Sequence, residues 1–186
     1  MLSKWRNRKD VARITKTAHP VGRVTLAVLA AFAMCSSLAF GAAKQQNMPV
    51  LSQVVVNCIF QTAPSLNFLG YDPSGVNSTL PLDQTALLQI SCTRGATTTI
   101  GIDNGTHVGQ ATIGTRALAD GPKYLGYDLY QDSGRTTLWT NTGAGLYNYV
   151  SLSSLPTTIS IYGRVFPSQN APTGIYTDTL VITINY

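Results

Sequence analysis

The sequence predicts an all-β protein, an antiparallel β-sandwich that follows an export signal. Three observations lead to this class. Helix signals are nearly absent after residue 44, because Gly, Pro and paired Thr interrupt every window long enough for an amphipathic helix. Segments that alternate apolar and polar residues recur instead, separated by turn residues. The part after residue 43 also has few charges, no Glu, and many Thr, Ser, Gly and Tyr, as exported strand-rich domains do.

Residues 1–43 are predicted to be a secretory signal peptide. Seven of the 13 Lys and Arg precede residue 24, an apolar run follows from Val24 to Phe40, and small residues end it. A basic head, an apolar stretch and a small-residue end are the parts of such a signal. We expect cleavage after Gly41 or Ala43. A retained membrane anchor is the alternative, since roughly 17 apolar residues is the lower limit for spanning a bilayer.

Removal of residues 1–43 reverses the charge of the protein. The whole chain carries +5, but six basic and seven acidic residues remain, a net charge of −1. A nucleic-acid partner is therefore excluded, because no cationic patch is left to bind one. The remaining length suits one domain that can bury a core.

Five segments carry the strand pattern, in which every second residue is apolar: ALLQISC over residues 86–92, TTTIGID over 97–103, KYLGYDLYQD over 123–132, TTISIYGRV over 157–165 and DTLVITINY over 178–186. The residues expected to face the core in the first four are Leu88, Ile90, Cys92, Ile100, Ile102, Leu125, Tyr127, Leu129, Ile159 and Ile161. In all, six or seven short strands in a domain of this size indicate a sandwich.

Turn signals separate these segments. Asn104-Gly105 and Ser133-Gly134 each predict a turn, the first of the kind that joins two strands in a hairpin. Residues 72–83 and 103–122, rich in Gly, Pro and small polar residues, are expected to be mobile connecting loops.

Cys58 and Cys92 are the two cysteines that remain after the signal. In an exported protein an even pair predicts one disulfide, which closes a loop of about 34 residues and contributes about 3–4 kcal/mol. Two separate buried thiols are the alternative.

The last segment, residues 178–186, has the features of a strand at the edge of a sheet. Its apolar face is formed by alternate residues: Leu180, Ile182, Ile184 and Tyr186. Chain ends are usually polar and frayed, whereas this one is apolar and β-branched. A strand of this kind must lie in a sheet, and at an edge it exposes unpaired backbone groups.

The segment KQQNMPVLSQVVVNC, which begins at Lys44, has the complementary property. It is a polar leader followed by apolar side chains of one parity: Met48, Val50, Val54 and Val56. At about 3.3 Å per residue it is long enough to span one strand of a neighbouring molecule. The residues alone leave two options open, namely donation of this strand to a neighbour and an ordinary first strand of its own domain.

The sequence indicates no catalytic site and no metal site. His107 is the one histidine after residue 43, no nucleophile-elbow pattern accompanies it, and the seven Asp are scattered at turns. We therefore expect no enzyme activity, cofactor, metal or small-molecule substrate, and a surface position for His107. Arg164 and Asp178 are a candidate internal ion pair. Four tyrosines form either an exposed adhesive surface or ordinary solvent-facing β positions: Tyr124, Tyr130, Tyr147 and Tyr149.

Several separated motifs then occur in a fixed order: NCIFQTAPSLNFLGYDP, Pro81-Leu82-Asp83, Ser91-Cys92-Thr93, YLGYDLYQDSGRTTLW and YGRVFPSQNAPTGIYTDTLVITINY. Together they resemble the spore coat protein U domain, the subunit family of archaic chaperone–usher pili. The resemblance covers essentially all of residues 50–186, and the C-terminal motif matches most closely.

The resemblance implies an incomplete immunoglobulin-like β-sandwich of six to seven antiparallel strands, whose final strand is completed by a donor strand from another chain. It places the domain at residues 57–186 and the donor segment at 44–56, pairs Cys58 with Cys92, and makes the apolar face of residues 180–186 the acceptor and chaperone-pairing strand. Pro49 departs from a regular donor because it removes one ladder hydrogen bond.

The same resemblance implies a structural subunit that polymerises by donor-strand complementation and exchange and serves surface attachment and biofilm formation. The implied partners are copies of itself or related pilins, a periplasmic chaperone and an outer-membrane usher. The implied route runs through the periplasm to the cell surface. A secreted spore-coat or matrix protein, or a tip-associated binding module of the same fold, is the alternative.

Overall fold

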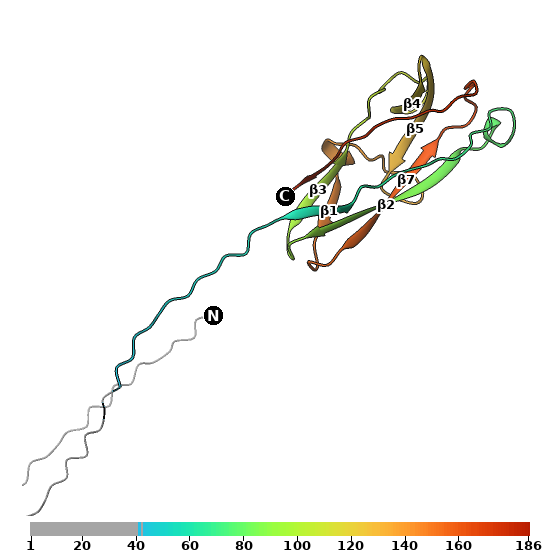
Figure 1. Ribbon diagram of the computed structural model, residues 1–186. Helices are drawn as coiled ribbons and strands as arrows, with labels where there is room; N and C mark the ends of the chain where they lie inside the picture. Colours follow the sequence, from blue (N-terminus) through green and yellow to red (C-terminus); the bar gives the residue numbers. More distant parts are fainter. Residues whose placement is uncertain (1–40, 42) are drawn as a thin grey trace, which may run out of the picture. The chain divides into compact units, whose positions relative to one another are not determined.

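The computed structural model describes residue 41 and residues 43–186 (Figure 1). The predicted signal peptide therefore lies outside the described residues, except for Gly41 and Ala43. The chain divides into two units after Pro49, and the described residues of the first unit form no helix or strand. In the described part of the chain, no helix is long and apolar enough to cross a bilayer.

The second unit, residues 50–186, contains two antiparallel sheets (Figure 1). The larger has the order β1 (Cys58–Thr62), β2 (Leu82–Cys92), β7 (Thr157–Val165), β5 (Lys123–Tyr130) and β4 (Arg116–Asp120). The smaller has the order β6 (Tyr147–Val150), β3 (Thr97–Ile102) and β8 (Ile182–Asn185). Two short 3-10 helices, η1 (Val76–Ser78) and η2 (Gly143–Gly145), lie in the connections. The predicted all-β sandwich is confirmed, with eight strands described rather than six or seven.

The core lies between the two sheets and is built by the predicted alternation. All ten side chains expected to face inward are buried, and Leu88, Ile90 and Ile100 are fully inaccessible. Trp139, between β5 and η2, completes the core. Its indole Nε1 donates to the carbonyl oxygen of Ile100 at 2.9 Å, and its ring stacks on Tyr147 with centroids 5.0 Å apart.

Both of the expected loops contain regular structure. The 103–122 stretch contains β4, which forms a hairpin with β5 through Gly121 (φ 59°), and the 72–83 stretch contains η1 and the start of β2. Asn104-Gly105 does not join a hairpin, because β3 pairs with β6 and β8. The four tyrosines for which an exposed adhesive surface was one alternative are half-buried, two of them in β6.

Candidate functional site: the groove between the edge strands

The open side of the sandwich lies between β1 and β8. Within the described residues, β1 pairs only with β2 and β8 pairs only with β3, so each has one free edge. The Tyr186 hydroxyl donates to Asn57 Oδ1 at 3.3 Å, which places the end of β8 beside the start of β1. Figure 1 shows the C-terminus at this point. The two edge strands therefore run in opposite directions along the opening.

A groove with a volume of about 620 Å³ lies in this opening. One wall is formed by β1 from Phe60 onward and the segment after it, as far as Phe68, and the other by residues 178–182. Core side chains form the floor: Ile102, Leu129 and Ile161. The groove exists because none of the described strands bridges the two sheets here, so the core is reached from solvent at this edge. We call it the edge groove.

The acceptor residues predicted from the sequence lie along this groove. Leu180, Ile182 and Ile184 share a face, are half-buried and pack against the core. Leu180 and Ile182 line the groove itself, whereas Tyr186 lies at its end and is 59% exposed. Val181 and Thr183 point to solvent, as the alternation requires.

The predicted donor segment forms no strand in this chain. Its apolar side chains are exposed, with Met48 at 81%, Val50 at 80% and Val54 at 83%. Val56 is 53% exposed and lies between Val55 and Asn57, which are both hydrogen-bonded to Thr93. The Thr93 hydroxyl donates to the Val55 carbonyl oxygen at 3.1 Å, and the Thr93 amide donates to that of Asn57 at 2.9 Å. Residues from Val55 onward are thus held by their own domain.

Cys58 and Cys92 form a disulfide, and they are direct partners in the β1–β2 ladder. The bond ties the strand that forms one wall of the groove to the centre of the larger sheet. Cys58 is the buried residue of β1, whose other residues are exposed, so the disulfide is a principal anchor of this strand.

Replacement of both cysteines with serine is expected to lower the free energy of unfolding by about 3–4 kcal/mol, because the crosslink closes a loop with a sequence separation of 34. Urea titration of the purified subunit measures this change. Ser91→Ala, next to Cys92, is the matched control and should change stability little. Equal stability of the double variant and the parent would contradict the anchoring role.

Asp178 lies where the groove meets the segment that leads into β8. Its side chain is 1% exposed and accepts hydrogen bonds from the Thr106 hydroxyl at 2.7 Å and the Tyr127 hydroxyl at 2.9 Å. Burial, and then the Asp178 carboxylate, raise the pKa of Tyr127 well above the ordinary value of a phenol, so this hydroxyl remains a donor. Asp178 therefore fastens the start of the acceptor segment to β5 and to the loop after β3.

One expectation about charged residues is corrected here. Arg164 does not pair with Asp178. It forms two hydrogen bonds of 2.8 Å with Asp83, its ladder partner across β2 and β7, and they lower the pKa of that carboxyl. His107 lies at the surface as expected, with its side chain 34% exposed, and its Nδ1 lies 3.3 Å from Asp178 Oδ1.

Substitution of Asp178 with alanine is expected to destabilise the domain by about 3 kcal/mol, because it leaves several donors, including the Tyr127 hydroxyl, without their acceptor in a buried place. Asp120→Ala is the control, since Asp120 is partly exposed and, among the described residues, its carboxylate pairs with Lys123 alone, at 3.0 Å. Urea unfolding of both variants checks the prediction. A similar loss of unfolding free energy in both variants would contradict the role of Asp178 in fastening the acceptor segment.

Sequence reasoning missed the wall formed by Leu66 and Phe68. Phe68 is buried and packs edge-on against Tyr127 with ring centroids 5.7 Å apart. A Cβ atom on Gly163 of β7 would lie 2.5 Å from Leu66 Cδ2 and 2.7 Å from Phe68 Cζ. Glycine inside the alternating strand TTISIYGRV was the available signal, since it often marks a place where another segment approaches the backbone.

The groove offers apolar side chains and a free backbone edge rather than reactive groups. Among the described residues, no group of three or more His, Cys, Asp or Glu could hold a metal ion. What the arrangement can do is bind an extended apolar segment, with ladder hydrogen bonds to β8 and side chains inserted toward the core.

Comparison with known proteins gives matches to a domain family and to a related protein. The sequence model of the Spore Coat Protein U domain matches residues 44–183. Protein U of Myxococcus xanthus is 36% identical over 129 residues, which cover 66% of this chain and 72% of that protein.

A solved structure also matches, the CsuC–CsuE chaperone–tip adhesion subunit pre-assembly complex of the archaic chaperone-usher Csu pili of Acinetobacter baumannii. The TM-score is 0.50 at 16% sequence identity, and the match covers 72% of this chain but only 40% of that chain. At this identity the likeness concerns the fold alone.

Proposed function

This chain belongs to the spore coat protein U domain family, and from this premise we propose that it is a structural subunit of an archaic chaperone–usher pilus. In this proposal the subunit polymerises by donor-strand complementation and exchange. The observation that carries it is the edge groove, an apolar opening between two unpaired strand edges that reaches the core.

The free energy gained by inserting a donor strand into the groove favours assembly. Each Val or Met side chain that moves from solvent into the groove contributes about 1.5–3 kcal/mol, and Met48, Val50 and Val54 are all exposed in this chain. Each new ladder hydrogen bond to β8 adds about 1 kcal/mol. Exchange of one inserted strand for another needs no chemical energy input, because both strands make the same kinds of contact.

The direction of β8 favours a donor from another molecule. Because β8 ends beside Asn57, residues 44–56 folded back into their own groove would run parallel to β8. The same segment from a neighbour is free of this constraint and can run antiparallel, the orientation that gives the more stable ladder.

The length of the donor also fits. Since Val55 and Asn57 are held by Thr93 of their own domain, the donor available to a neighbour ends at Val54. Residues 46–54 are as long as the acceptor segment 178–186. An antiparallel register that pairs these two stretches brings Val50 beside Ile182 and Val54 beside Asp178, with the predicted donor face directed into the groove.

The proposal includes a chaperone and an usher. An exposed groove of this kind favours aggregation before assembly. A periplasmic chaperone that lends a strand beside β8 covers it, and the outer-membrane usher exchanges that strand for the next subunit's residues 46–54. In this route the subunit crosses the periplasm with the chaperone and reaches the cell surface through the usher, where the fibre serves attachment and biofilm formation.

A secreted coat or matrix protein of the same fold is the second candidate. The identity with Protein U and the family's description as a spore coat domain favour it. A coat protein does not require a linear polymer linked by inserted strands, so assembly separates the two candidates.

The test is expression of the chain with a periplasmic chaperone and an usher of the archaic class. We expect a chaperone–subunit complex in the periplasm and, with the usher, surface fibres that migrate as ladders in cold detergent and collapse to monomer on boiling. A chain that stays monomeric, without binding the chaperone, would contradict the pilus function and leave the coat candidate.

A further inference from the structure

Two leucines project from the end of the domain at which β1 begins. Leu152 is 84% exposed and Leu155 is 71% exposed. The loop that bears them is held in place, because the buried Ser151 hydroxyl lies within hydrogen-bond distance of two carbonyl oxygens, those of Cys92 at 3.1 Å and Ser153 at 2.8 Å. We call residues 151–155 the leucine loop.

The leucine loop shares its end of the domain with the donor's point of attachment. The Ser151 carbonyl oxygen accepts from Gly95 at 2.8 Å, and Thr93 in the same turn holds Val55 and Asn57. The donor segment and the leucine loop therefore leave the domain from the same end.

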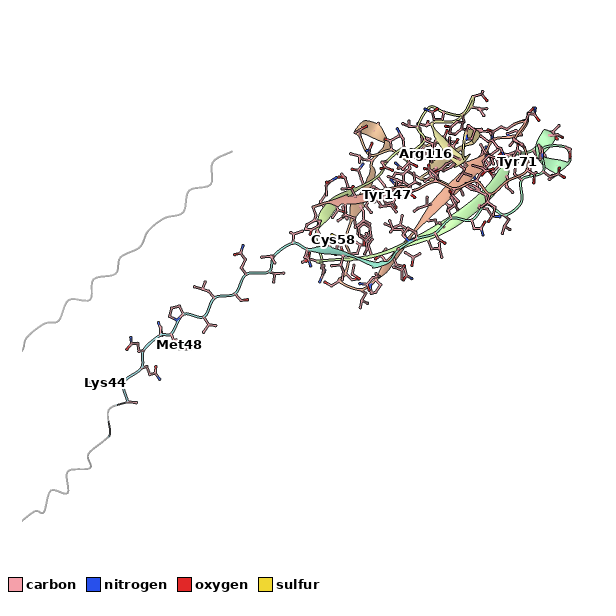
Figure 2. All side chains as sticks on the ribbon, turned by 45° about the horizontal axis from the view of Figure 1, so that its top comes forward. Lys44, Met48, Cys58, Tyr71, Arg116 and Tyr147 are labelled. Carbon is pink, nitrogen blue, oxygen red and sulfur yellow. A yellow bond between two sulfur atoms is a disulfide. The ribbon has the colours of Figure 1, made fainter. Side chains whose placement is uncertain are left out.

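The opposite end of the domain carries a second hollow of about 710 Å³. It lies between residues 66–73 and residues 171–178, and its floor includes Leu82, Leu118, Leu125 and Val165. Figure 2 shows Cys58, beside the donor's attachment, and Tyr71, in the rim of this hollow, at opposite ends of the domain. We call it the end hollow.

The end hollow continues the edge groove. The two share Leu66, Phe68, Leu118 and Asp178 among their lining residues. A donor in the register described above reaches Asp178 with its last free residue, Val54. It therefore fills the edge groove as far as this junction and leaves the end hollow open.

We infer that the end hollow receives the leucine loop of the donor subunit, a second copy of this chain. The inference rests on the proposed function, since the donor's insertion is what brings the two ends together. Val54 at the acceptor's Asp178 is followed at once by Val55, which is fixed to its own Thr93. One residue spans about 3.3 Å, so the donor domain's attached end must lie against the acceptor's end hollow.

This contact gives the joint between subunits a second point of attachment. An inserted strand that is joined to its own domain at one point, Val55, still lets adjacent domains rotate about that point. Burial of Leu152 and Leu155 against the apolar floor of the hollow, formed by Leu82, Leu118, Leu125 and Val165, removes that freedom and stabilises one angle between neighbours. The two surfaces belong to opposite ends of the same chain, so the contact repeats along the fibre without closing.

Crosslinking in the assembled fibre tests the inference. The full chain carries Leu152→Cys together with Ile175→Cys, a residue of the hollow that is 83% exposed, and fibres are treated with a short bifunctional maleimide. We expect covalent multimers that survive boiling. The control pair is Leu152→Cys with Leu87→Cys, on the outer face of β2 and 57% exposed, which should give several-fold less crosslinking.

Leu152→Asp with Leu155→Asp supplies an independent measurement. We expect ladders in cold detergent as in the parent, because strand insertion is intact, but more sharply bent fibres in electron micrographs. Ladders without preferential crosslinking and with unchanged fibre curvature would overturn this contact while leaving donor-strand assembly standing. Absence of any fibre from the parent chain would overturn both.

Discussion

Replacement of Val50 with aspartate is expected to abolish fibre growth while leaving the subunit folded and able to bind its chaperone. The Val50 side chain is 80% exposed in its own chain, so its replacement removes nothing from the core. In the proposed fibre the same side chain enters an apolar groove next to Ile182. An unpaired carboxylate there costs several kcal/mol, which is enough to prevent strand exchange. Met48→Asp is expected to act in the same way.

Leu51→Asp is the matched control for this experiment. Leu51 is adjacent and even more exposed, at 92%, but it has the opposite parity and points away from the groove in an extended donor. Usher-dependent ladders in cold detergent measure assembly, and co-purification with the chaperone measures folding. Fibre growth by the Val50 variant, or an equal loss with Leu51→Asp, would refute the donor assignment.

Replacement of Ile182 with aspartate is expected to remove the subunit from the periplasm altogether. Ile182 lines the edge groove, faces the core and pairs with Ile102 in the β3–β8 ladder. A carboxylate at this place destabilises the domain itself by about 3–5 kcal/mol, and it also spoils the surface that the chaperone must cover. Unfolded subunits are then degraded.

Val181→Asp is the control on the opposite face of the same segment, since its side chain is 59% exposed. Immunoblots of periplasmic extracts, with and without the chaperone, give the steady-state amounts. We expect Ile182→Asp to be absent and Val181→Asp to accumulate. Normal accumulation of both variants would take residue 182 out of the core and the acceptor face.

The sequence was sufficient for the strands whose alternation is undisturbed. Ile100 and Ile102 in β3, and Ile159 and Ile161 in β7, are buried as expected, because each lies on one side of a strand between polar neighbours. The all-β class and the apolar face of the last segment follow from the same period of two.

Strand β4 was not predicted from the alternation, because its first buried residue is charged. Arg116 is fully buried, and its guanidinium donates to the carbonyl oxygens of Trp139 at 2.7 Å, Ile102 at 3.0 Å and Asp103 at 2.8 Å. An arginine whose Nε and Nη2 donate to three carbonyls can occupy a core position, although Nη1 of Arg116 has no hydrogen-bond partner among the described residues. A pattern that counts only apolar residues places it on the surface.

The groove itself could not be predicted from the residue pattern of any single segment. Its walls come from residues 60–68 and 178–182, which only the three-dimensional fold brings together. The role of Asp178 depends likewise on Thr106 and Tyr127, which lie on other elements. Sequence spacing indicated which faces were apolar, but not which of them would remain uncovered.

The most direct test of the account is the stability of the domain with its groove filled from within. A second copy of residues 44–56, attached after Tyr186 through a short turn, would run antiparallel to β8 in the edge groove. Calorimetry should show a marked rise in Tm over the parent chain and loss of the ability to polymerise, and both effects should vanish when Val50→Asp is placed in the attached copy. The contrary result would be a parent chain that is already a reversibly folding monomer, with a Tm that the attached strand leaves unchanged.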